Sequence, residues 1–185
     1  MSSAIILPYN SVMPHISASA FIAENATIIG DVTIGDETGI WYGCVVRGDV
    51  NLIKIGKRTN IQDGTVIHVW RNKELGATII GDEVTVGHKA MLHACELQDR
   101  CFIGMGAIIM DKAVVEEGGM VAAGTLISPG KIVRSGEIWA GNPGRFFRKM
   151  TEEESNFIVE SADNYVQHAI EYLEQQRQQK AEISK

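Results

Sequence analysis

The chain has 185 residues, of which 45% are hydrophobic and 22% charged, which is typical of a soluble domain with a short appendage. The net charge of −6, with no basic run, argues against a nucleic-acid or membrane-surface partner. No apolar stretch approaches the roughly 20 residues of a membrane span, and no signal peptide is evident. Three cysteines without CxxC spacing favour a reducing, cytoplasmic location.

Aliphatic residues recur every six positions from residue 16 to residue 133. A six-residue period fits neither a 3.6-residue helix nor a two-residue alternation, and it predicts a short extended segment followed by a corner. We expect the recurring residue to point inward at each repeat. The series is Ile16, Ile22, Ile28, Ile34, Ile40, Val46 and Leu52, then, after a three-residue slip, Ile55, Ile61 and Ile67, then, after an interruption at 69–79, Ile80, Val86 and Leu92, and finally Leu97, Ile103, Ile109, Val115, Val121, Ile127 and Val133.

This repeat resembles that of the hexapeptide-repeat family. The resemblance implies an all-β solenoid, a left-handed parallel β-helix of triangular cross-section with three hexads per coil. We expect this β-helix to occupy residues 1–150. Because each coil buries its faces against its neighbours, the ends of the stack need caps.

Residues 151–185 are predicted to form a capping α-helix that packs on the β-helix. Thr151 and Glu154 have the spacing of a capping box at a helix N-terminus. The residues with helical spacing after them are Ile158, Ala162, Tyr165, Val166, Ala169 and Leu173.

His68 and His93 are predicted to lie one above the other at one corner of the triangle. Three hexads return the chain to the same corner, and these two histidines are separated by three hexads plus a seven-residue insertion. Adjacent strands lie about 4.8 Å apart. Two imidazoles in such a column could share a metal at about 2.0–2.1 Å each.

His88 falls at the next corner, on the order of 15 Å away along the extended chain. It cannot complete a site with the two other histidines of its own chain, but a neighbouring subunit could supply it. We therefore expect a homotrimer with three shared sites, each leaving one metal position open. His15 and His168 are interpreted as ordinary solvated or hydrogen-bonded side chains.

The same counting places further polar residues at these two corners. Arg47 falls one coil below His68, and Gln62 and Asp63 fall one coil below Gly87 and His88. We expect Arg47 and Asp49 to form an ion pair between subunits, which would support the trimer.

At these residues the sequence resembles the γ-class carbonic anhydrases. The segments that carry the resemblance are Arg47-Gly-Asp49, Asn60 to His68, Val86-Gly-His88 with His93, and the tail from Ser161 to Val166. The resemblance implies a homotrimer that binds zinc, or iron or cobalt, through His68 and His93 of one subunit and His88 of the next. The implied reaction is hydration of CO2 to bicarbonate by a metal-bound hydroxide. Gln62, positioned by Asn60, would be the hydrogen-bond partner of that hydroxide, and Tyr165 would either reach the pocket or pack as an aromatic.

The sequence departs from that family where a proton relay is expected. Val50 stands where the archetypal enzymes carry a glutamate after the Arg-x-Asp segment, and the 69–79 loop offers only Glu74 beside Arg71 and Lys73. Turnover is therefore expected to be low without a buffer that carries the proton.

Two other functions stay open from the sequence. Many hexapeptide-repeat proteins transfer acyl groups, and the segment Gly141-Asn-Pro-Gly144 is similar to a turn of those enzymes, so an acyltransferase or an acyl-CoA thioesterase is an alternative. A non-catalytic, metal-binding trimeric scaffold is the other. Acyl transfer needs one histidine base rather than three converging imidazoles.

Overall fold

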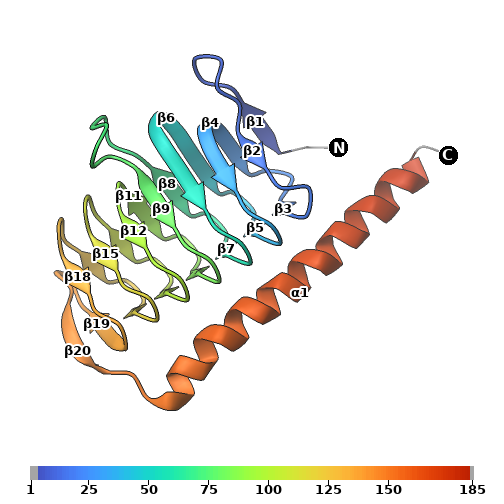
Figure 1. Ribbon diagram of the computed structural model, residues 1–185. Helices are drawn as coiled ribbons and strands as arrows, with labels where there is room; N and C mark the ends of the chain where they lie inside the picture. Colours follow the sequence, from blue (N-terminus) through green and yellow to red (C-terminus); the bar gives the residue numbers. More distant parts are fainter. Residues whose placement is uncertain (1–3, 184–185) are drawn as a thin grey trace.

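The computed structural model describes residues 4–183 and shows a left-handed parallel β-helix followed by one long helix (Figure 1). Short strands and tight corners repeat along the stack, and strands of successive coils pair in parallel. The all-β solenoid implied by the resemblance to the hexapeptide-repeat family is confirmed.

The coils build three faces, here called A, B and C in the order in which the chain visits them. Face A contains β1 (Ile5–Leu7), the first parts of β4 (Thr27–Ile34) and β6 (Val45–Ile55), β8 (Val66–His68), β11 (Met91–His93), β14 (Ile108–Ile109) and β17 (Leu126–Ile127). Face B contains β2 (His15–Ile16), the second parts of β4 and β6, β9 (Thr78–Ile80), β12 (Glu96–Leu97), β15 (Val114–Val115) and β18 (Ile132–Val133). Face C contains β3 (Phe21–Ile22), β5 (Gly39–Ile40), β7 (Asn60–Ile61), β10 (Thr85–Val86), β13 (Phe102–Ile103), β16 (Met120–Val121), β19 (Glu137–Ala140) and the antiparallel β20 (Arg145–Lys149).

The inward aliphatic series fills the centre of the triangle. From the second coil on, its members are at most 1% exposed: Ile28, Ile34, Ile40, Val46, Ile55, Ile61, Ile67, Ile80, Val86, Leu92, Leu97, Ile103, Ile109, Val115, Val121, Ile127 and Val133. Full burial of one such side chain contributes about 1.5–3 kcal/mol. This continuous ladder is the structural basis of the six-residue period in the sequence.

The expectation that Leu52 points inward is wrong. Leu52 is 39% exposed, and Ile53 is buried in its place. The cause is an irregularity in β6, because Gly48 pairs with Gly30 whereas Ile53 pairs with Val32, so that residues 49–52 bulge out of the ladder. A six-residue period in the sequence gives no indication of a bulge that lies inside one hexad.

The C-terminal helix, α1 (Glu152–Ile183), runs back along the solenoid and lies over face C (Figure 1). The expected capping box is confirmed: the Thr151 amide donates to Glu154 Oε2 at 2.9 Å, and the Glu154 amide donates to Thr151 Oγ1 at 3.2 Å. Ile158, Ala162 and Ala169 are buried against the strands beneath. The helix therefore covers the face that carries Asn60.

The three cysteines are free thiols in the core. Burial raises the pKa of Cys44 to about 11 and that of Cys95 to about 12, and it also raises the pKa of Cys101. At neutral pH these groups are protonated, so they act as small apolar side chains. Within residues 4–183, no helix combines the length and the apolar character that crossing a membrane requires.

Candidate metal centre

His68 and His93 end two neighbouring strands of face A. His93 of β11 pairs in register with His68 of β8, and their ring centroids are 5.2 Å apart. The column predicted by counting three hexads plus the loop insertion is therefore present. Both side chains are partly exposed at the corner between faces A and B, at 23% and 29%.

A carboxylate holds each of these two imidazoles. Asp49 Oδ1 lies 3.0 Å from His68 Nε2, and Asp111 Oδ1 lies 2.5 Å from His93 Nδ1. Carboxylate–histidine contacts of this kind fix the ring orientation of metal ligands and raise their basicity. The carboxylates thus engage one nitrogen of each ring, Nε2 of His68 and Nδ1 of His93.

Asp111 is a site residue that the sequence reasoning missed. It follows His93 by three hexads, which is one uninterrupted coil, so the same counting that paired the histidines could have found it. The column of polar residues at this corner therefore extends one coil beyond His93.

Arg47 and Asp49 form an ion pair within one chain. Both side chains come from β6, two residues apart, and lie at the same corner of one subunit. An ion pair between subunits stays a prediction, because it involves a second chain. Burial alone would raise the pKa of Asp49, but hydrogen bonds from His68 and Arg47 outweigh that effect and hold the pKa below its usual value. Asp49 is thus a carboxylate shared between a guanidinium and an imidazole.

His88 lies at a different corner, the one between faces C and A. Its Nδ1 is 2.9 Å from Asp63 Oδ2, one coil below, and its side chain is 42% exposed. A Cβ added to the preceding Gly87 would lie 2.6 Å from the Met105 amide nitrogen, so only glycine lets the coils stack this closely beside His88. In the described part of one chain, no group of three His, Cys, Asp or Glu residues is arranged to hold a metal.

A chain of buried amide and hydroxyl groups leads from the helix to Gln62. Gln62 Nε2 donates to Asn60 Oδ1 at 3.1 Å, and Asn60 Nδ2 donates to Thr85 Oγ1 at 2.9 Å. Thr85 Oγ1 in turn lies 3.2 Å from Ser161 Oγ of α1. The hydrogen bond to Asn60 therefore orients the side-chain amide of Gln62, which is 6% exposed.

Gln62 and His88 both line a cleft of about 460 Å³ between face C and α1, here called the helix cleft. Tyr165 lines it as well and packs edge-on against Trp41, with ring centroids 5.6 Å apart, so it both packs and reaches the cleft. Burial and the charge of Asp63 raise the pKa of Tyr165, which keeps its hydroxyl protonated at neutral pH. Apolar side chains, Phe102, Met105, Met120 and Phe157 among them, form much of the remaining wall.

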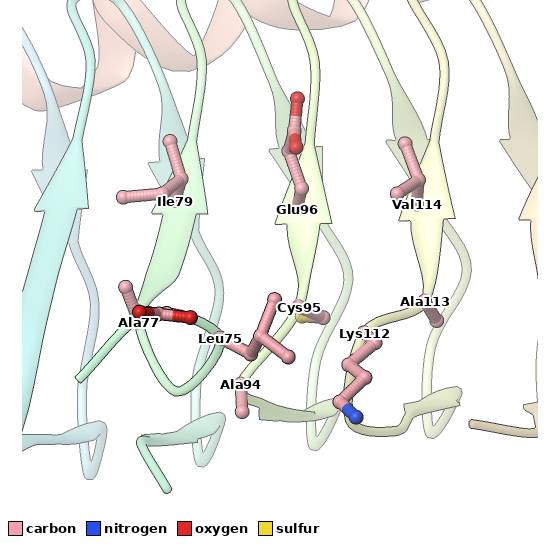
Figure 2. Close-up of a pocket in the computed structure, with 10 residues that line it drawn as sticks. Leu75, Ala77, Ile79, Ala94, Cys95, Glu96, Lys112, Ala113 and Val114 are labelled. Atoms are coloured by element: carbon pink, nitrogen blue, oxygen red, sulfur yellow. The ribbon is translucent and has the colours of Figure 1, made fainter. Parts of the chain in front are cut away.

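Glu74 does not join the histidines. It lines a separate cavity of about 250 Å³ over face B, together with Glu96 and Lys112. Figure 2 shows Ile79, Glu96 and Val114 side by side on β9, β12 and β15, with Leu75 beneath them. Val50 is half-buried and packs against the core. Neither residue provides an evident proton path from the centre.

Curated proteins share extensive similarity with this chain. "Gamma carbonic anhydrase 1, mitochondrial" of Arabidopsis thaliana is 53% identical over 155 residues, which cover 82% of this chain and 56% of that protein. "Carbonic anhydrase" of Geobacillus kaustophilus is 48% identical over 175 residues, with 94% of each chain covered. The chain thus spans little more than half of the plant relative and nearly all of the bacterial one.

A solved structure shares the whole fold. The hexapeptide transferase family protein of Anaplasma phagocytophilum is 52% identical, with a TM-score of 0.87 over 91% of this chain and 98% of that one. No model of a known protein family matches the chain.

Proposed function

This chain belongs to the γ-carbonic anhydrase-like family of hexapeptide-repeat proteins, and from that premise we propose that it hydrates CO2 reversibly to bicarbonate. The centre would hold zinc, or iron or cobalt, between two subunits of a homotrimer. The observation that carries the proposal is the stacked pair His68 and His93, each held by a carboxylate, with His88 at a second corner.

The donor set fits a divalent transition metal. Three imidazoles are the ligands of hydrating zinc enzymes, and they leave one coordination position open, while partners such as aspartates orient them. His68 and His93 supply two ligands from one corner, and His88 of a neighbouring subunit would supply the third. Each subunit would then contribute His68 and His93 to one centre and His88 to another. Head-to-tail contacts of this kind can close into a ring, here a ring of three subunits.

An outward-facing aliphatic column on face A supports this assembly. Its members, stacked in register, are Val45, Val66, Met91, Ile108 and Leu126. Val66 is 41% exposed and Met91 44% exposed, which is unfavourable for a free surface and favourable for a subunit contact. The column passes beside His68 and His93, which follow Val66 and Met91 by two residues on the same strands. Packing of face A against a second subunit would therefore bring a further corner to these histidines.

The surrounding residues would orient the reactants. A bound divalent cation supplies a water that is activated for attack at neutral pH. Gln62, whose side-chain amide is held by Asn60, would form a hydrogen bond with that water. Asp49, Asp63 and Asp111 would keep the imidazoles aligned. The protonated hydroxyl of Tyr165 could donate to bicarbonate at the edge of the cleft.

We expect the zinc-loaded protein to sediment as a trimer and to catalyse CO2 hydration in a stopped-flow indicator assay, and both chelation and His93→Ala to abolish the activity. The matched control is His15→Ala, which removes an imidazole of β2 on face B. Full metal occupancy without hydration would favour the scaffold alternative. A monomer that binds metal stoichiometrically would overturn the shared centre.

We expect Asp111→Asn to weaken metal binding by about 10–100-fold, the range typical of partners of ligating histidines. The amide keeps the shape but removes the charge that aligns His93. Competition with a chromogenic chelator would measure the change. Asp163→Asn is the control, because Asp163 contacts Arg58 on the surface and should leave affinity unaltered. Equal affinities in both variants would mean that Asp111 has no part in the centre.

A further inference from the structure

The helix cleft is larger than its proposed substrate needs. CO2 has three heavy atoms, whereas a volume of about 460 Å³ lies within the roughly 300–1,000 Å³ of pockets that enclose drug-sized ligands. The cleft extends from Gln62 and His88 toward coils nearer the C-terminus, where it is lined by residues of β13, β16 and α1. Hydration of CO2 gives no reason for this extension.

The two ends of the cleft differ in chemistry. One end carries polar groups, namely Gln62, His88, Ser161 and Tyr165. The other end is apolar, with Phe102 of β13 and Phe157 of α1 stacked at 5.5 Å between centroids.

The apolar end of the cleft has exposed apolar surface that a ligand could bury. Met105 is 58% exposed and Phe157 49% exposed, so both still have apolar surface to bury. Ala122 and Ala123 leave room between them and the aromatic wall. Of the described side chains that line the cleft, none is Asp, Glu, Lys or Arg. The occupant of this end must therefore be uncharged and apolar.

We propose that the helix cleft binds the apolar acyl group of an ester or thioester and that the same centre hydrolyses it. This proposal deepens the proposed function and rests on it for the activated water. The carbonyl would lie near Gln62 and the acyl chain would lie along Phe102, Met120 and Phe157. The reaction balances with water alone: water oxygen bonds to the carbonyl carbon, the bond from that carbon to the leaving oxygen or sulfur breaks, and the two products retain the protons of the water.

The first test compares chain lengths with the zinc-loaded, full-length protein. Each methylene buried is worth about a fourfold gain in binding, from about 0.8 kcal/mol. We expect kcat/KM for p-nitrophenyl hexanoate to exceed that for p-nitrophenyl acetate at least tenfold, after correction for their spontaneous rates. S-hexanoyl-N-acetylcysteamine against its acetyl analogue tests the thioester in the same way. No preference for the longer chain in either series would overturn the proposal.

Variants then locate the preference. Ala122→Phe should fill the apolar end and reduce the ratio of hexanoate to acetate toward one, and Phe157→Ala should reduce it by removing the wall. Phe147→Ala is the matched control, since Phe147 is 63% exposed and lies outside the cleft. If the control changes the ratio as much, or if Phe157→Ala dissociates the trimer, the apolar end is not an acyl site.

A binding measurement separates this proposal from the proposed function. N-methylhexanamide is an uncharged analogue of a hexanoyl ester that is not readily hydrolysed, and calorimetry should show it binding at least tenfold more tightly than N-methylacetamide. The same preference is expected for metal-free His68→Ala, because the cleft lies within one chain. Selective binding without CO2 hydration would support the acyl-binding cleft and overturn the proposed hydratase function. CO2 hydration without preferential binding of the hexanoyl analogue would support the proposed function and overturn the acyl site.

Discussion

We expect His88→Ala to abolish tight metal binding, and the double variant His68→Ala/His93→Ala to do the same. The two variants should complement each other when they are co-expressed. The His88→Ala chain retains the stacked pair His68 and His93, and the double variant retains His88. In any trimer that contains both kinds of chain, one interface brings the stacked pair together with an intact His88. Differentially tagged mixed trimers should therefore bind one metal each, against three for the wild type and none for either variant alone.

The counting of metal per mixed trimer is the critical measurement. His15→Ala lies on β2, far along the chain from the centre, and should leave the stoichiometry at three. If mixed trimers bind no metal, the two corners do not meet across subunits. If the His88→Ala trimer binds three metals by itself, the stacked pair and its aspartates are a complete site.

Val50→Glu should raise the rate of CO2 hydration at low buffer concentration by at least about tenfold, a modest share of the roughly 10²–10⁴-fold that a positioned proton-transfer group contributes. Position 50 adjoins Asp49, whose carboxylate contacts His68, so a glutamate there could carry protons from the centre. In the wild type we expect a slow rate that rises with imidazole buffer. Stopped-flow assays over a buffer series measure both effects.

The control for this variant is Val50→Gln, which has nearly the same shape and carries no titratable group. Since Val50 packs against the core, both substitutions are expected to lower the free energy of unfolding to a similar extent. Only the glutamate should reduce the dependence of the hydration rate on buffer concentration. A wild type that turns over rapidly without buffer would mean that another side chain carries the proton.

Much of the centre was predictable because a solenoid converts sequence distance into height. His68 and His93 lie in register although the chain between them is longer than one coil, since the seven-residue insertion lies in the loop 69–77 and does not disturb the strands. The position of His88 followed from the same arithmetic. A fold in which contacts recur at a fixed interval is favourable for this kind of reasoning.

The features that were missed depend on contacts outside that interval. The bulge at residues 49–52 exposes Leu52, and hexad counting contains no signal for it. The helix cleft depends on how α1 docks on face C, which the helical pattern does not specify. The amphipathic spacing identifies the buried side of the helix but not the gap left beside Phe157.

The separation of His68 and His93 from His88 has a thermodynamic consequence. In the proposed trimer, metal binding and subunit association are linked equilibria, because no single subunit, over its described residues, carries a complete ligand set. A ligand that binds only the assembled state stabilises it by about 2.7 kcal/mol when its free concentration is 100 times its dissociation constant. The supply of one metal ion would then govern how firmly three chains stay together, and dilution of the protein would release the ion.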